Sequence, residues 1–195
     1  MVGALKNLTP AEHERVNAAI AAAQARTEAR FAFVTVHASD RYHLYPVVWG
    51  ATLALMAFGA LALGLPHLAV RFAFAIVAAV FVVASVLLEW QPLRMLAVPA
   101  NAKRAHARAL AHREFAVRIL SHPEHAGGML FFVSLAERYA ELIADHALHQ
   151  AAGQAAWDSI VRDFTAEAAR GRLAEAIVRA SNACGVLLEM HHPKA

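Results

Sequence analysis

A continuous apolar segment from Leu44 to Leu88 constrains this chain more than any other feature. It contains a single charged side chain, Arg71. About 20 apolar residues are enough to span the roughly 30 Å hydrocarbon core of a bilayer. The segment is therefore long enough to cross twice, and it predicts a helical hairpin with spans over residues 44–65 and 72–88. Gly64-Leu65-Pro66-His67 is the expected turn, because glycine and proline interrupt helices.

The alternative is a pair of buried helices in a soluble all-α protein. A helix that packs on a soluble core normally carries a polar stripe at 3.6-residue spacing, and AFAIVAAVFVVASVLL carries none. A cleaved signal peptide is disfavoured further, because the segment begins late and continues too long. Aromatic rings favour the headgroup level of a bilayer, and four stand at the ends of the spans: Tyr42, Tyr45, Trp49 and Trp90.

Basic residues flank the apolar segment on both sides. They are Arg26, Arg30 and Arg41 before it, and Arg94, Lys103, Arg104, Arg108, Arg113 and Arg118 after it. Since basic residues near spans stay on the cytoplasmic side, both termini and the soluble part are expected in the cytoplasm, on a multi-pass inner-membrane protein. The same residues favour contact with anionic lipid headgroups. No recognition motif or aromatic interleaving supports nucleic acid as a partner.

The segments outside the hairpin predict an α/β fold, a small mixed β-sheet between helices. Thr9, Pro10 and Glu12 predict the start of a helix, with Thr9 as its cap and Glu12 completing a capping box, and this helix is expected to run to about Ala29. Apolar runs predict strands over residues 31–37, 129–135 and 138–144, the last two joined as an antiparallel hairpin. Helices are expected over residues 101–120, 154–170 and 172–190. In the first of these, the inward set is predicted as Ala105, Ala109, Phe115 and Ile119.

The strand at residues 31–37 is apolar on both faces and has no partner nearby in the sequence. A strand of this kind needs cover on both faces and neighbours in a sheet. Its partners are therefore expected beyond the hairpin, which is possible because two spans return the chain to the same side. The expected organisation is residues 1–43 as the first part of one domain, 44–90 as the transmembrane hairpin, and 91–195 as the remainder of that domain.

Several segments in this order resemble the TPM-domain family, in the bacterial branch that carries a membrane hairpin after the first strand. They are LTPAEHERVNAAIAAAQARTEARFAFV, SDRY at residues 39–42, GMLFFVSLAERYAELIADHAL, and the stretch from Gly153 to Pro193. The resemblance implies a mixed sheet between helix layers. The wider family includes a thylakoid-lumen protein credited with acid phosphatase activity, relatives that bind calcium at loop acids, and auxiliary proteins of membrane complexes.

Two functions follow from that resemblance, and they differ in how they use the loop acids. Where many members carry a G-Y-G-L-E type turn after the third strand, this chain reads Asp145-His146-Ala147-Leu148-His149, without the glycines and the final acid. This departure favours a non-catalytic assembly or regulatory module that works with a membrane protein complex. The alternative is a metal-dependent phosphatase or calcium-binding domain.

Asp40 and Asp145 are the candidate metal ligands for that alternative, with Glu137 and Glu141 nearby in the sequence. A divalent cation such as calcium is the cofactor they could hold, although calcium takes six to eight oxygen ligands. If the first and third strands run parallel, both aspartates emerge at one edge of the sheet. The competing interpretation is structural: Asp40 is solvated in a loop beside the membrane, and Asp145 begins a turn.

Other residues that could carry chemistry have simpler explanations. The histidines, including His122-x-x-His125 and His146-x-x-His149, lack the HExxH pattern of a catalytic zinc helix. Cys184 is the single cysteine, so no intramolecular disulfide can form. It lies on the apolar face of its helix, where a thiol acts as a small hydrophobe.

Overall fold

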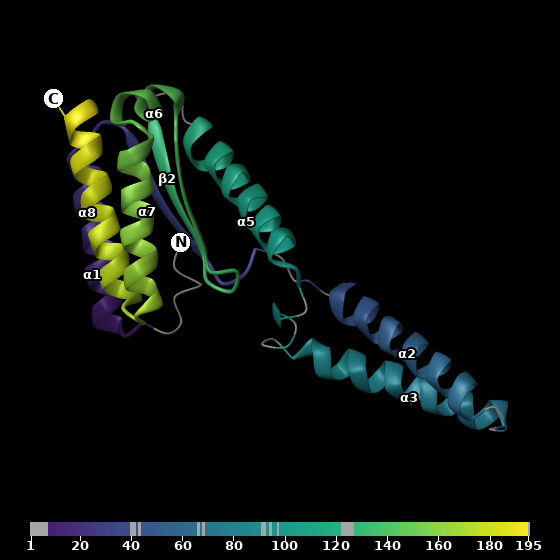
Figure 1. Ribbon diagram of the computed structural model, residues 1–195. Coiled ribbons are helices and arrows are strands. Elements are labelled where there is room, and N and C mark those ends of the chain that lie inside the picture. The colour runs from purple at the N-terminus through teal and green to yellow at the C-terminus, as the bar shows by residue number, and fades with distance from the viewer. Residues whose placement is uncertain are drawn as a thin grey trace. The chain divides into compact units, whose positions relative to one another are not determined.

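The protein is described by a computed structural model that covers residues 8–39, 42, 44–65, 67, 69–90, 93, 95–96, 98–121 and 127–194. The chain divides into two compact units. One joins Met1–Ser39 to Ala105–Ala195, and the other comprises Asp40–Arg104. The fold is mixed α/β, with a three-stranded sheet in the first unit and two long apolar helices in the second (Figure 1).

The sheet has the strand order β1-β2-β3, with β1 at Arg30–Val36, β2 at Gly128–Ser134 and β3 at Tyr139–Ala144. β1 and β2 run parallel, from the pair Arg30–Gly128 to the pair Val36–Ser134. β2 and β3 run antiparallel, joined by a tight turn. The expected pairing of the first strand with a strand beyond the apolar segment is therefore confirmed, as is the β2–β3 hairpin.

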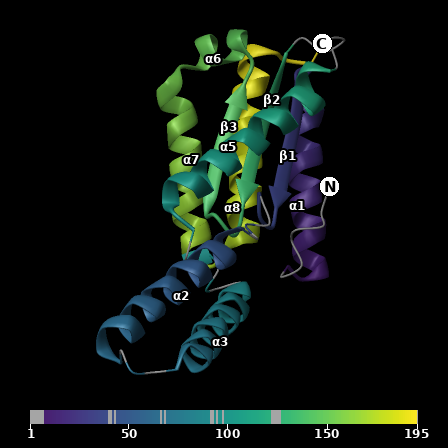
Figure 2. The same cartoon turned by 90° about the vertical axis from the view of Figure 1, so that its right-hand side faces the viewer.

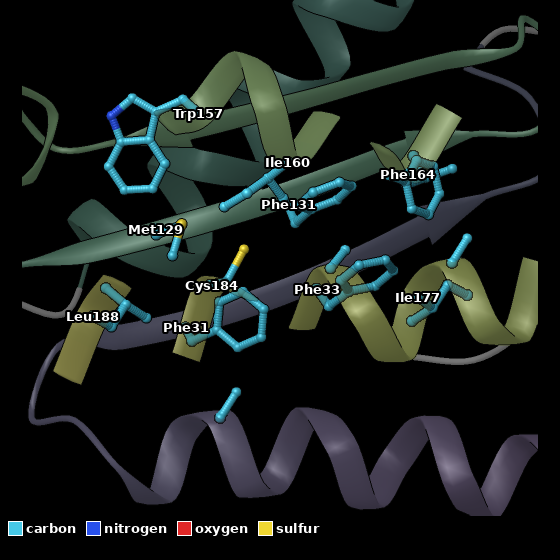
Figure 3. Close-up of a cluster of buried hydrophobic side chains, with 14 of the residues drawn as sticks. Phe31, Phe33, Met129, Phe131, Trp157, Ile160, Phe164, Ile177, Cys184 and Leu188 are labelled. Atoms are coloured by element: carbon cyan, nitrogen blue, oxygen red, sulfur yellow. The ribbon is translucent and has the colours of Figure 1, made fainter. Parts of the chain in front are cut away.

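One face of the sheet is covered by α1 (Pro10–Ala25), α7 (Gln154–Ala169) and α8 (Leu173–His191), with the short α6 (His146–Ala152) at one end. Alternate strand residues enter this core, among them Phe31, Phe33 and Phe131. The rings of Phe33 and Phe131 stack at 5.1 Å, and Phe164 of α7 meets Phe131 edge-on (Figure 3). All seven residues of β2 are buried, as its unbroken apolar sequence predicts.

The opposite face is covered by α5 (Ala100–Phe115) and the π-helical turn η1 (Ala116–Leu120), shown across the sheet in Figure 2. Here Ala111 and Ile119 meet Val34, Leu130 and Phe132. The predicted inward face of this helix is wrong at two positions: Ala105 and Ala109 are exposed, while Ala107 and Ala111 are fully buried. Most apolar residues of α5 are alanines, so the sequence gives little contrast between its faces.

The second unit contains α2 (Leu44–Gly64) and α3 (Val70–Glu89), which pack against each other. Both are long and apolar enough to cross a membrane, with mean hydropathies of 1.9 and 2.6. No residue of α3 is buried, and only Pro46, Gly50 and Ala54 of α2 are. At Gly50 the helices approach so closely that a Cβ atom would collide with the Ser85 side chain.

Candidate functional site

The acids that the sequence singles out are distributed between the two ends of the sheet. β1 ends at Val36, beside Ser134 and Tyr139, whereas Asp145 follows β3 at the other end, beside Gly128. A seven-residue strand is about 20 Å long. The premise that the first and third strands run parallel is wrong, because β1 and β3 lie on either side of β2 in opposite directions. Asp40 lies outside the described residues, so its carboxylate is not placed.

Asp145 is the N-terminal cap of α6. Its Oδ1 accepts a hydrogen bond from the Leu148 backbone N–H at 2.9 Å, and its Oδ2 accepts one from Gly128 N–H at 2.7 Å. Gly127 approaches the same carboxylate so closely that a Cβ there would collide with Oδ2, and its φ of 122° is one that glycine tolerates. Both oxygens of Asp145 are thus used to join the start of β2 to the start of α6, in agreement with the structural interpretation of this residue.

Glu137 occupies the turn between β2 and β3, at the opposite end of the sheet. Its Oε1 accepts hydrogen bonds from Ser39 N–H at 2.9 Å and from Ser39 Oγ at 2.8 Å, while its Oε2 accepts one from the buried Ser134 hydroxyl. The turn itself is closed by Arg138 N–H, which donates to the Leu135 carbonyl at 3.3 Å, and Ala136 N–H donates to the His37 carbonyl at 2.8 Å. This carboxylate ties the segment after β1 to the β2–β3 turn across 98 positions of sequence.

The described histidines and acids do not assemble into a metal site. Among the described parts of the chain, no three His, Cys, Asp or Glu side chains gather in a way that could hold an ion. His122 and His125 lie outside those parts. His146 and His149 fall on α6, where His146 contacts Gln150 at 3.0 Å. Glu141 faces α5, with Arg108 and His112 at 4.0 and 3.9 Å and the Tyr139 hydroxyl at 2.9 Å.

A cavity of about 370 Å³ opens beside the Glu137 turn, between the β2–β3 hairpin and the end of α7. This volume is in the range of small-ligand pockets. Its wall is mostly apolar, with polar groups from Ser134, Arg138, Tyr139 and Thr165. Arg138 is exposed, and its backbone adopts the left-handed conformation at φ 51° that reverses the chain. The cavity can accept an apolar group with a polar or acidic end.

A second charged cluster joins α7 to α8 around Glu167, and sequence reasoning missed it. The Glu167 carboxylate is almost buried and meets the guanidinium groups of Arg170, Arg172 and Arg179 at 3.0, 2.8 and 3.3 Å. The three arginine side chains are at least half exposed. From the sequence, only the pairs of Glu167 with Arg170 and Arg172, three and five residues later, could have been predicted. The contact with Arg179 depends on how α7 and α8 pack.

Cys184 lies in the middle of the main core, among residues of the strands and of α8 (Figure 3). Burial raises the pKa of its thiol far above the ordinary value, because the thiolate would lose its hydration. The thiolate is the reactive form of cysteine. Cys184 is therefore a packing residue, as its position in the sequence predicts.

Comparisons with known proteins identify a fold but no family. No protein-family model matches the chain, and no curated protein matches it. Among solved structures, the chain is similar to the BA42 protein from the psychrophilic bacterium Bizionia argentinensis, determined by NMR. The TM-score is 0.56 at 12% sequence identity, over 99% of this chain and 89% of that one. At this identity the likeness extends to the fold alone, which the two chains share.

Proposed function

We propose that this chain is a membrane-anchored, TPM-like module that assembles with or regulates a membrane protein complex, and that it has no catalytic activity of its own. The observation that carries the proposal is that the carboxylates of Asp145 and Glu137 are engaged in hydrogen bonds that hold the fold together. Both oxygens of Asp145 accept backbone hydrogen bonds, and Glu137 accepts three from two serines. A carboxylate engaged in this way would have to give up bonds that hold the fold before it could ligate a cation or activate water.

The proposed location is a bacterial inner membrane, crossed by α2 and α3, with both termini in the cytoplasm. The exposure of these helices supports it: large apolar side chains such as Leu55, Phe74 and Val86 are 67–73% exposed. Apolar surface of this extent needs a lipid or protein partner. The basic residues that flank the spans support the orientation.

The surface proposed to meet the protein complex is the cavity beside the Glu137 turn. It combines an apolar wall from Phe164 and Leu173 with polar groups at its rim, which suits a side chain or short segment of a partner. A photo-crosslinking residue at Thr165, which lines the cavity, should give a discrete product with a membrane protein in cells. The matched control places the photo-crosslinking amino acid at position 158 in place of Asp158, which is also on α7 but outside the cavity. This variant should give no such product.

A phosphatase assay tests the non-catalytic part of the proposal. The full chain in mild detergent is expected to release no p-nitrophenol from p-nitrophenyl phosphate above the buffer rate, with or without calcium. Asp145→Ala and Glu137→Gln should leave that background unchanged, as should the control Asp158→Asn. Turnover that disappears with a chelator and in Asp145→Ala would overturn the proposal and favour the metal-dependent phosphatase.

A further inference from the structure

The outer face of α5 is unusual among the helices that cover the sheet, because it is basic. Residues 100–120 carry five basic side chains and one acid: Lys103, Arg104, Arg108, Arg113, Arg118 and Glu114. The acid is already paired, since Glu114 and Arg118 meet at 2.6 Å. On the other side of the sheet, α7 carries three acids and one arginine: Asp158, Asp163, Glu167 and Arg162. The two outer layers of the sheet thus differ in the sign of their charge.

Two arginines of α5 lie on opposite sides of a ridge of exposed alanines. Ala107 and Ala111 are fully buried against the sheet, so the residues two positions away, at roughly 200° around the helix, point outward. These are Ala105 and Ala109, both exposed. At the same rotation per residue, Arg108 lies on one side of the ridge and Arg113 on the other. A flat, negatively charged surface could approach the alanines and be met by arginines from both sides.

Apolar side chains extend the same surface beyond the end of α5. Val117 and Leu120 of η1 are 60% and 62% exposed, on either side of Arg118 and four or more residues after Arg113. Arg113 has no ion pair with any described residue, and the contact of Arg108 with Glu141 is a long one at 4.0 Å. Basic residues combined with exposed apolar side chains are what helices lying at a membrane surface present.

We propose that this face of α5, made by Ala105, Arg108, Ala109, Arg113, Val117 and Leu120, binds the phosphate headgroups of anionic lipids in the bilayer that α2 and α3 cross. The inference rests on the proposed membrane anchorage. Only ten residues separate the end of α3 from the start of α5. A tether this short keeps α5 at a high effective concentration near the bilayer, so weak contacts suffice. Charge selects the occupant, because each basic residue near an anionic leaflet adds to the attraction.

The test uses the full chain in nanodiscs of phosphatidylcholine alone or mixed with phosphatidylglycerol. An environment-sensitive fluorophore is placed at Ala109→Cys, and Cys184 stays unlabelled because it is buried. The emission is expected to shift to the blue in the anionic discs only and to return in high salt, which screens surface charge. Inorganic phosphate added to phosphatidylcholine discs should have no effect. A fluorophore at Ala18→Cys, on the exposed face of α1, should not respond in either disc.

Charge variants decide whether the arginines are responsible. Arg108→Gln with Arg113→Gln should lower the docking equilibrium constant by about 30-fold, since two basic contacts are lost. Arg108→Lys with Arg113→Lys should keep most of the docking equilibrium constant, because the charge is retained. That result would exclude misfolding as the reason for the loss in the glutamine variant. The matched control, Arg15→Gln with Arg162→Gln, removes the same charge from exposed positions on α1 and α7 and should have no effect.

Equal emission in the two lipid compositions, or a blue shift that survives Arg108→Gln with Arg113→Gln, would overturn the headgroup inference while leaving the anchorage intact. Failure of the wild-type chain to enter nanodiscs at all would instead overturn the anchorage on which it rests.

Discussion

β2 and α3 are both strongly apolar elements, and they lie in opposite surroundings. Every residue of β2 is buried, whereas no residue of α3 is. β2 receives its cover from β1, β3 and helices on both faces of the sheet. α3 contacts α2 along one side and leaves side chains such as Phe74 and Val82 open. An apolar sequence alone therefore does not predict whether an element is covered by the rest of the protein. That depends on how many other helices and strands pack against it.

The largest effect is expected from charges placed on the open surface of α3. Two arginines at Ala79 and Val82 should cost about 5–7 kcal/mol of insertion, because each charge near the centre of a span costs about 2.5–3.5 kcal/mol. Both positions are exposed. The measurement is the fraction of chain that stays in membranes after alkaline carbonate extraction.

The matched control places arginines at Ala18 and Ala22, two exposed alanines on α1. If α1 faces water, each change should alter stability by no more than about 0.5 kcal/mol and leave extraction unchanged. Equal tolerance of arginines in α3 and α1 would mean that both helices face water, and the contrast with β2 would have to be explained without a bilayer.

A deletion in the sheet sharpens the other side of the comparison. Phe131→Ala removes a fully buried ring that stacks on Phe33 and meets Phe164 edge-on. It should lower the free energy of unfolding by about 3–5 kcal/mol. Phe74→Ala, at a side chain that is 73% exposed, should leave the unfolding of the sheet unit unchanged. Chemical denaturation in detergent, followed by near-UV circular dichroism, gives both values, and similar losses would contradict the assignment of Phe131 to the core.

Asp145→Ala is expected to have an intermediate effect. It removes the cap of α6 and leaves Gly128 N–H without its acceptor, so a loss of about 1–2 kcal/mol is expected in the same denaturation experiment. Asp145→Asn should recover part of it, because asparagine also caps helices. The control is Asp158→Ala, whose carboxylate accepts a hydrogen bond from the exposed Gln154 side chain at 2.8 Å. A loss in Asp145→Ala no larger than in the control would argue against the structural role.

The smallest effect concerns the start of α1. Thr9 accepts from Glu12 N–H, and Glu12 accepts from Thr9 N–H at 2.7 Å, which confirms the predicted capping box. Thr9→Ala should cost about 1 kcal/mol. The bonds from Thr9 N–H and from the Thr9 hydroxyl, each 2.7 Å long, both lower the pKa of Glu12, and Thr9→Ala removes the hydroxyl bond. The contribution of that bond is present above the ordinary pKa of glutamate and is lost as the pH falls through the lowered pKa. The stability difference between wild type and Thr9→Ala should therefore shrink in acid, and a difference that grows would contradict this assignment.

The strands were predictable because each apolar run is about as long as a strand and is bounded by residues that favour turns. The two faces of β3 were predictable as well: Ala140, Leu142 and Ala144 face the main core, while Tyr139 and Ile143 face α5. The face of α5 was not, since alanines at neighbouring positions differ too little in hydrophobicity to fix a direction. The short α6 was not predicted, because only a turn beginning at Asp145 was expected between the third strand and the helix that begins at Gln154.

The site was less predictable than the fold, for a geometric reason. Glu137 and Asp145 could be selected as acids on either side of the third strand, but only the antiparallel direction of β3 against β1 brings Glu137, and not Asp145, to the end of β1. The bond between Glu137 and Ser39, and that between Glu167 and Arg179, join residues brought together only by tertiary packing. Residue type and spacing identify candidates for chemistry, and strand direction decides which of them meet.

The central claim, that α2 and α3 form a membrane hairpin with the rest of the chain on the cytoplasmic side, is tested most directly by thiol labelling. Cysteine is placed at His67, between the two helices, or at Ala18 on α1; both positions are exposed, and the native Cys184 is buried. In bacterial spheroplasts, a membrane-impermeant maleimide should label His67→Cys at once, and Ala18→Cys only after detergent is added. Labelling of both variants before detergent, or of Ala18→Cys alone, would contradict the claim.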